Sequence, residues 1–449
     1  MLKLFFWLRY LRKKKIVLLS IASVALAAAL LIVVASLFGG FIDEVDRIAP
    51  TIFGDIYLNP WVGIPDYEEL LERLEQLPEV EAAAAVLDTY GLLHLGSGDV
   101  RAVRVVGINP AQYSKVTGFK NSLLVQKQIS SELTFAPADR PDKAGGFVSI
   151  GIFGKPDEKT DRYDFEGQKQ QWFGKDVVLT TGVVVERERD SESGRTQQKF
   201  KSKHLKFNIT DIVFVGMYFQ DSQDIYLPIE KVRELAGGAG AAGKDIKIKL
   251  AEGIEPKAAI EPVRQVWIDF ARQHNLPEYA VSQPVLQTYK QMLEDFVGEL
   301  KKQLGVLMLI FGVVCSVGVL LIFCIFYMIV MTRLKDIAVI KSCGGAGGTV
   351  ASIFIGFGIY VGVVGSAIGI ALGYFVTRNI NVIEEWVTVV TGLKLWKSSA
   401  YMFSTIPNEV DVGATCWIVF FTILASALGA LIPAIVAART KPVDILRYE

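Results

Sequence analysis

The chain contains four long apolar stretches separated by polar segments. None of them contains an acidic or basic side chain, and they occupy Ile16–Phe41, Leu304–Met331, Ile353–Val376 and Ala414–Ala438. About 20 apolar residues suffice for a helix to cross the hydrocarbon core of a membrane, so each stretch is predicted to be a transmembrane helix. The first is longer than the apolar part of a cleaved signal peptide, which has about 7–15 residues, and we interpret it as a membrane anchor.

The charges beside these stretches predict how the chain is oriented. Basic residues dominate the amphipathic segment 1–15, the loop 332–352 and the tail 439–449, whereas acidic residues follow the first stretch. Short segments rich in Lys and Arg stay in the cytoplasm. We therefore expect both termini and the loop 332–352 to be cytoplasmic, and residues 42–303 and 377–413 to lie outside.

The polar segment 42–303 alternates between helical and extended patterns, which is typical of an α+β domain. Helices are expected at 66–77 and 255–273, strands at 80–95, 100–108, 177–186, 207–217 and 246–250, and a charged hairpin around 187–195. Residues 287–304 are expected to lead without a break into the second transmembrane helix. All four cysteines lie in or beside the apolar stretches, so this domain must be held by its own core without disulfides. The predicted fold is an α-helical membrane protein with four transmembrane helices and a large α+β extracytoplasmic domain.

The composition and motifs indicate no nucleic-acid, metal, catalytic or nucleotide site. The 47 basic residues equal the 47 acidic ones, which gives no signal for nucleic acid. The three histidines are scattered, and no spacing typical of a metal site or a catalytic triad is present. The segment Gly238–Asp245 (GAGAAGKD) matches half of a phosphate-binding loop, but Asp245 stands where a Ser or Thr should hold Mg²⁺, and we interpret it as a turn. We predict no bound cofactor, no metal and no enzymatic activity, so any work requires energy from a partner.

Glycines line one side of the third apolar stretch. Successive steps of four, three, four and four residues separate Gly358, Gly362, Gly365, Gly369 and Gly373. These steps place the five glycines on one helical face, where the missing side chains let two backbones approach closely. The partner is either a helix of the same chain or a helix of a second chain.

The loop between the second and third stretches carries a short amphipathic motif, RLKDIAVIKSCGG, at Arg333–Gly345. Leu334, Ile337 and Ile340 offer apolar side chains for burial, framed by charges. By itself the motif fits both a plain connector and a docking segment.

This motif resembles the coupling-helix signature E-I-A-I-L-[KR]-x-x-G-A of ABC transporter permeases of the MacB/FtsX/Lol type. Asp336–Gly345 matches most positions and departs conservatively at Asp336, Val339, Ile340 and Gly345. Other segments are similar to lipoprotein-releasing (Lol) permeases: the start Phe6–Leu11, the strand Phe214–Tyr218, the stretch Tyr401–Pro407 and the ending Pro433–Glu449. Together these similarities cover nearly the whole chain.

The resemblance implies a MacB-like (type VII) permease of the bacterial inner membrane. Two ATPase subunits would hydrolyse ATP with Mg²⁺, and a second permease chain, identical or paralogous, would complete the transporter. The coupling residues would be Arg333, Asp336, Ile337, Ala338, Ile340, Lys341 and Gly344. The first two helices would enclose the cargo, a lipoprotein or another amphiphile, near Phe38, Phe41, Leu304, Met308 and Phe311.

The same resemblance leaves three functions to compare. A lipoprotein-releasing permease is expected first, because the stretch Tyr401–Pro407 and the ending favour it. A MacB-like efflux permease and an FtsX-like signalling regulator are the alternatives. A periplasmic carrier could receive the cargo, although the tip Arg187–Arg195 is polar and lacks the apolar loop with Pro and Gly that binds such a carrier in Lol permeases.

Overall fold

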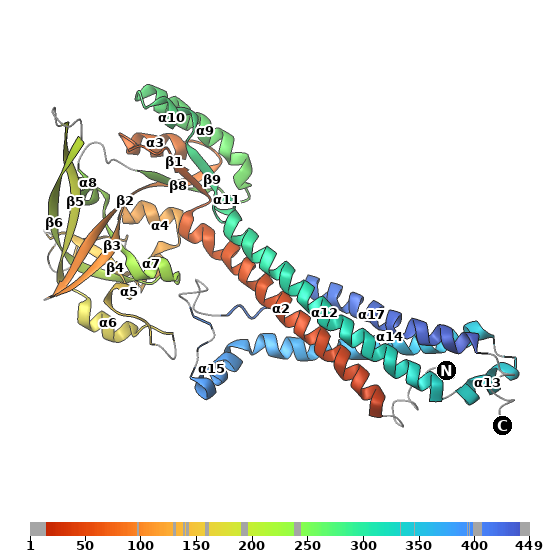
Figure 1. Cartoon of the computed structure of the whole chain (residues 1–449). Coiled ribbons are helices and arrows are strands. Elements are labelled where there is room, and N and C mark those ends of the chain that lie inside the picture. Colours follow the sequence, from red (N-terminus) through yellow and green to blue (C-terminus); the bar gives the residue numbers. More distant parts are fainter. Residues whose placement is uncertain are drawn as a thin grey trace. The chain divides into compact units, whose positions relative to one another are not determined.

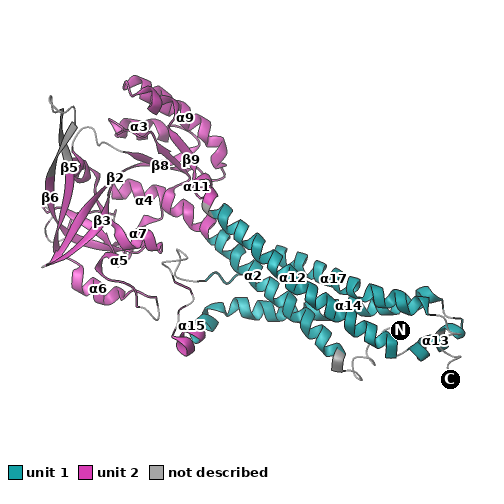
Figure 2. Cartoon of the chain, in the orientation of Figure 1, with its two compact units in different colours: residues 1–44, 296–386, 406–449 teal, residues 45–295, 387–405 magenta. Residues whose placement is uncertain are grey.

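The computed structural model describes residues 15–440 except for 97, 129–131, 138–139, 141–142, 158–160, 190–195, 238–243, 333, 345, 393, 395 and 398–405 (Figure 1). The chain divides into two compact units (Figure 2). Unit 1 comprises Met1–Glu44, Phe296–Trp386 and Ile406–Glu449, and unit 2 comprises Val45–Asp295 and Val387–Thr405. The amino-terminal segment 1–14 and the ending 441–449 lie outside the described residues.

Four helices are long and apolar enough to cross a membrane. They are α2 (Lys15–Phe53), α12 (Glu294–Thr332), α14 (Gly347–Arg378) and α17 (Val412–Arg439), and each contains one of the expected spans. Helix α2 continues past its apolar run because Val45, Ala49 and Ile52 keep a helical spacing and are buried.

All four helices contribute to one apolar cluster in unit 1. Its members include Val24 of α2, Phe326 of α12, Phe357 of α14 and Ala430 of α17. Among the described residues, two shorter helices follow in the chain: α13 (Leu334–Ser342) between α12 and α14, and α15 (Ile380–Thr391) after α14, of which residues 387–391 belong to unit 2.

Unit 2 is built on a nine-stranded mixed sheet with the order β3-β7-β4-β6-β5-β2-β8-β1-β9. The strands are β1 (Ile56–Asn59), β2 (Val80–Gly96), β3 (Asp99–Ile108), β4 (Gly145–Ser149), β5 (Asp176–Arg189), β6 (Thr196–Val213), β7 (Asp224–Pro228), β8 (Asp245–Leu250) and β9 (Val285–Thr288). The long strand β2 pairs with β3 as well as with β5, so six strands close on themselves. The other end of β2 pairs with β8 and extends the sheet through β1 to β9.

The helices of unit 2 pack on this sheet. They are α3 (Tyr67–Glu75), α4 (Pro110–Val116), α5 (Ile150–Phe153), α6 (Phe165–Trp172), α7 (Tyr218–Gln223), α8 (Ile229–Ala236), α9 (Pro256–Gln273), α10 (Glu278–Ser282) and α11 (Tyr289–Met292), with 3₁₀ turns at Phe119–Ser122 and Gln126–Gln128. Gly107 in β3 lets α8 approach, because a Cβ there would lie 2.8 Å from the Cβ of Val232. The large side chains Trp267 and Phe270 of α9 are fully buried in the main core.

The predicted combination of four spans with a large α+β domain is confirmed, but two predicted elements were wrong in detail. The continuation of the hairpin after residue 195 and the predicted strand 207–217 form a single strand, β6, which pairs with β5 over 196–208, then with β4, and ends at Val213. Residues 287–304 are not one helix. Residues 287 and 288 complete β9, a capping box at Thr288 starts the separate turn α11, and α12 begins only at Glu294.

Candidate functional site

Helix α13 packs against the ends of three membrane helices. Ile337 is only 4% exposed, and it belongs to a small apolar cluster with Val330 of α12, Val350 of α14 and Ala437 of α17. Ala338 beside it is fully buried. The apolar side of the motif is therefore occupied by the chain's own helices.

Lys341 adds a polar attachment at the same place. Its Nζ donates hydrogen bonds to the carbonyl oxygens of Ala438 and Thr440, at 2.7 and 2.6 Å. These carbonyls lie at the carboxyl end of α17, where the last turn of a helix leaves its acceptors without partners and a positive charge is favourable. Lys341 thus fastens α13 to the end of α17.

The opposite side of α13 faces outward. Val339 is 51% exposed, and Lys335, Ser342 and Cys343 are exposed as well. Gly344 follows the helix with a φ of 92°, a left-handed conformation that suits glycine. Of the other predicted coupling residues, Arg333 lies outside the described residues, whereas Asp336 and Ile340 belong to α13 but their side chains are not described.

The five glycines of α14 that the spacing singled out all contact helices of the same chain, in two groups. A Cβ at Gly358 would lie 2.6 Å from the Cβ of Ala430, and a Cβ at Gly362 would lie 3.0 Å from the Cα of Ile423, both in α17. The other three, Gly365, Gly369 and Gly373, approach Val24, Ala28 and Ile32 of α2 so closely that a Cβ would lie within 2.6–3.0 Å of them. Helix α14 therefore packs closely against α17 along its first half and against α2 along its second half.

The residues predicted to enclose cargo all lie on α2 and α12. Phe41 is buried, and Phe38, Leu304, Met308 and Phe311 are half-buried. The two helices meet further along, where a Cβ at Gly318 would lie 3.2 Å from the Oγ of Ser23. Helix α12 exposes one apolar face that includes Val306, Leu309, Val313 and Val317.

A buried lysine holds the end of α2 within unit 2. Lys247 of β8 donates hydrogen bonds from Nζ to the carbonyl oxygen of Ile52, at 2.7 Å, and to the hydroxyl of Tyr113, at 2.8 Å. The ammonium group also lies over the ring of Tyr113, 4.9 Å from its centroid. Helix α2 ends just beyond, where Gly54 has a φ of 77° and donates its N–H to the carbonyl of Pro50.

Sequence reasoning missed Lys247, because the strand predicted at 246–250 does not show what covers each of its faces. The end of α2 and α4 cover Lys247, so the lysine is buried. A lysine between two buried isoleucines, Ile246 and Ile248, is the available signal in the sequence.

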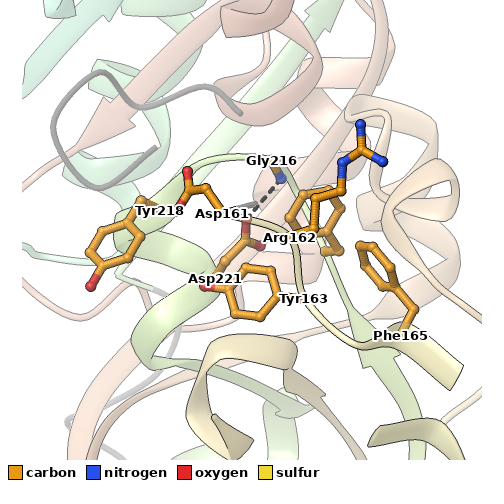
Figure 3. Close-up of a pocket in the computed structure, with 8 residues that line it drawn as sticks. Asp161, Arg162, Tyr163, Phe165, Gly216, Tyr218 and Asp221 are labelled. Atoms are coloured by element: carbon orange, nitrogen blue, oxygen red, sulfur yellow. Dashed lines mark hydrogen bonds between the residues drawn. The ribbon is translucent and has the colours of Figure 1, made fainter. Parts of the chain in front are cut away.

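A cavity of about 190 Å³ opens beside α7 in unit 2. Figure 3 shows the carboxyl group of Asp221 directed toward Gly216, with Tyr163, Phe165 and Tyr218 nearby. Asp221 accepts hydrogen bonds from the backbone N–H groups of Val215 and Gly216, at 2.7 and 2.9 Å. Burial raises the pKa of Asp221 to about 7, with a further contribution from the charge of Asp224.

The segment that resembles a phosphate-binding loop has other partners. Lys244 forms an ion pair with Asp88 at 3.1 Å, and Asp245 accepts a hydrogen bond from the side-chain amide of Asn59 at 2.6 Å. Burial raises the pKa of Asp245. Residues 238–243 lie outside the described residues. Among the residues that are described, no group of His, Cys, Asp and Glu is arranged to hold a metal.

Comparisons with known proteins agree with these features. Residues 308–443 match the family model of the FtsX-like permease C-terminal domain, which covers α13, α14 and α17. The chain is 22% identical to the lipoprotein-releasing system transmembrane protein LolC of Neisseria meningitidis, over 98% of each chain. It is also 22% identical to the corresponding protein LolE of Haemophilus influenzae, over 95% of this chain and 93% of that one.

A solved structure, the periplasmic region of MacB from Actinobacillus actinomycetemcomitans, aligns with 57% of this chain and 97% of its own, at 12% identity and a TM-score of 0.33. The matched domain and the full-length relatives support an ABC permease, a transport subunit rather than an enzyme. With the four apolar helices, they also support a protein of the bacterial inner membrane.

Proposed function

We propose that this chain, which carries the FtsX-like permease domain at 308–443, is the membrane subunit of an ABC transporter that releases lipoproteins from the inner membrane. Helix α13 receives the motion of a partner ATPase and passes it through the membrane helices to unit 2. The full-length similarity to LolC and LolE supports this choice of cargo.

The attachment of α13 carries the proposal. Ile337 joins α13 to α12, α14 and α17 through one apolar cluster, and Lys341 joins it to the end of α17 through two charge-assisted hydrogen bonds. A plain connector would not need to contact three membrane helices. A push on the exposed face around Val339 is therefore transmitted to all three at once.

The proposed partners are those that the resemblance to ABC permeases implies. Two ATPase subunits bind ATP and Mg²⁺, each docks on the α13 of one permease chain, and the second permease is identical or paralogous. Both termini and α13 lie in the cytoplasm, as the basic flanks indicate. Unit 2 then lies outside, where a carrier can receive the cargo.

Extraction of a lipid anchor from a membrane requires an outside source of energy. Each CH₂ group withdrawn from the hydrocarbon costs about 0.8 kcal/mol, so a lipoprotein with several acyl chains is held far more tightly than thermal motion can overcome. The half-buried apolar side chains of Phe38, Met308 and Phe311 on α2 and α12 provide a surface for these acyl chains.

The coupling role is tested by substitutions on the two faces of α13. The variant Val339→Asp changes an exposed side chain, so we expect it to lose the co-purifying ATPase and its ATP hydrolysis while the thermal stability stays within about 0.5 kcal/mol. The variant Ile337→Asp buries a carboxylate in the apolar cluster, so we expect it to destabilise the helix bundle itself. Gln265→Asp, on the exposed face of α9, controls for the added charge. Wild-type ATPase association in Val339→Asp would exclude docking through this face.

The cargo is tested separately with photoreactive amino acids at Phe38 and Met308 in the full transporter. We expect them to trap acylated protein, and the same group at Gln265 should not. Trapping of small amphiphiles alone would indicate the MacB-like efflux function. ATPase association without any trapped cargo would indicate the FtsX-like regulator.

A further inference from the structure

Helix α15 presents an apolar stripe that no part of the described chain covers. The stripe consists of Val382, Trp386, Val389 and Val390, which are separated by four, three and one residues and therefore share one helical face. All four side chains are exposed, Trp386 to 72% and Val389 to 81%. An apolar face of this kind on a helix that touches water on all sides is unfavourable.

The other side of α15 is held by polar contacts and burial. Asn381 accepts a hydrogen bond from the N–H of Ile406 and donates one to the carbonyl oxygen of the same residue, each at 3.0 Å. Thr388, about two turns further along the same side, is buried. The stripe therefore lies on the side of α15 that faces away from these contacts.

The position of α15 in the chain ties it to a membrane boundary. It begins two residues after α14 ends at Arg378, so it cannot move far from the end of that span. The last turns of α14 expose Tyr374 and Phe375, and α17, which starts from the same side, exposes Trp417 near its beginning. Exposed aromatic side chains at the ends of spans are typical of the boundary between lipid and water.

The segment after Ile406 anchors this region to the membrane bundle. The N–H of Asp411 donates to the Oγ of Ser36 in α2 at 3.3 Å, and a Cβ at Gly40 would lie 3.0 Å from Pro407. The amino-terminal end of α15 is thus connected through Asn381 and Ile406 to the end of α2 as well as to α14.

We propose that α15 is an interfacial helix whose stripe is buried in the lipid of the outer leaflet, at the boundary between acyl chains and head groups. Lipid is the occupant that fits, because the stripe contains no charge and α15 begins two residues after α14, whose last turns expose the aromatic residues Tyr374 and Phe375. Helix α15 sets how deeply the outer end of α14 lies in the membrane. It thereby also sets the depth of the glycine contacts between α14 and α2. This inference requires that the chain spans a membrane with the end of α14 on the outer side, and it does not depend on the cargo.

The test measures the depth of individual positions in the full chain. The protein, with its four native cysteines replaced by alanine, is reconstituted into nanodiscs of phosphatidylethanolamine and phosphatidylglycerol. Nitroxide spin labels are attached to Val389→Cys and Val390→Cys on the stripe, and to Thr391→Cys on the opposite side as the matched control. The collision rates with oxygen, which concentrates in lipid, and with a water-soluble nickel chelate are then compared.

We expect the ratio of oxygen to nickel accessibility to be several-fold higher at positions 389 and 390 than at 391. All these side chains are exposed, so the labels do not disturb the fold, and far-ultraviolet circular dichroism checks that each variant is folded. Equal nickel accessibility at the three positions would place α15 in water and overturn the proposal. Low accessibility to both reagents at 389 and 390 would also overturn it, because the stripe would then be covered by protein.

Discussion

Replacement of Gly369 by alanine perturbs the contact between α14 and α2 by a single methyl group. The added Cβ would lie 2.7 Å from the Cβ of Ala28 and 2.9 Å from the carbonyl oxygen of Ala25. Carbon atoms in ordinary contact are about 3.5–4.0 Å apart, so the two helices must separate by about 1 Å. Ala25 and Ala28 are short and attached to a rigid helix, and neither can rotate out of the way.

The expected change in the free energy of unfolding is the sum of two opposing contributions. Overpacking of a well-packed interior costs about 1–3 kcal/mol. Alanine instead of glycine inside a helix returns about 1 kcal/mol. The variant Gly312→Ala, in α12, receives the same gain but has no atom within 4 Å of its Cβ. The difference between the two variants therefore isolates the contact, and we expect Gly369→Ala to be less stable than Gly312→Ala by about 1–3 kcal/mol.

The free energy of unfolding of the two variants is compared in lipid–detergent micelles by titration with a denaturing detergent. Loss of helicity and exposure of a cysteine-reactive site are followed in parallel, so that the transition can be checked for two-state behaviour. Equal stability of the two variants would refute the reasoning, since it would mean that α14 and α2 can separate at no cost. Under the proposed coupling through α13 and α14, we further expect Gly369→Ala to lower ATP hydrolysis in the transporter.

Two further predictions concern unit 2. Lys247→Met removes the donor to Ile52 and Tyr113, and hydrogen bonds to charged groups contribute about 1.5–3 kcal/mol each, so we expect a loss of about 3 kcal/mol in unfolding experiments. The control Lys249→Met breaks only an exposed ion pair and should cost less than about 1 kcal/mol, and equal losses would contradict the role of Lys247. Burial raises the pKa of Asp221 from 3.8 to about 7, so the folded protein keeps a proton that the unfolded chain releases, and stability falls as the pH rises through this interval. Hydrogen exchange of residues 214–223, corrected for its intrinsic pH dependence, should show more opening at about pH 8 than at about pH 5, and the reverse order would contradict the shift.

The membrane helices could be predicted from sequence because a long uncharged stretch has only one stable arrangement in lipid, the helix. The glycine spacing in α14 likewise predicted a close helix contact. The pattern could not tell which neighbour each glycine meets, since one helical face can contact two helices that lie at different heights. In the structure Gly358 contacts α17 and Gly369 contacts α2.

The parts that sequence reasoning missed depend on contacts between distant segments. Lys247 occupies an alternating position that looks solvent-exposed, and it is buried by the end of α2, almost 200 residues earlier, and by α4. The predicted start of a helix at 287 was wrong because the local pattern is helical, whereas residues 285–288 pair with β1. The amphipathic pattern of α13 could be recognised in the sequence. The pattern did not show that Ile337 faces helices of the same chain.

The pairing of β1 with β9 has a mechanical consequence. Helix α2 leads directly into β1, and β9 leads through α11 into α12, so residues 45–295 are entered and left by two adjacent antiparallel strands. A relative displacement of these two connections along the strands acts as a shear on the hydrogen bonds between Ile56–Asn59 and Val285–Thr288, which resist it together rather than one after another. The edge strand β9 is therefore not peeled away by such a displacement.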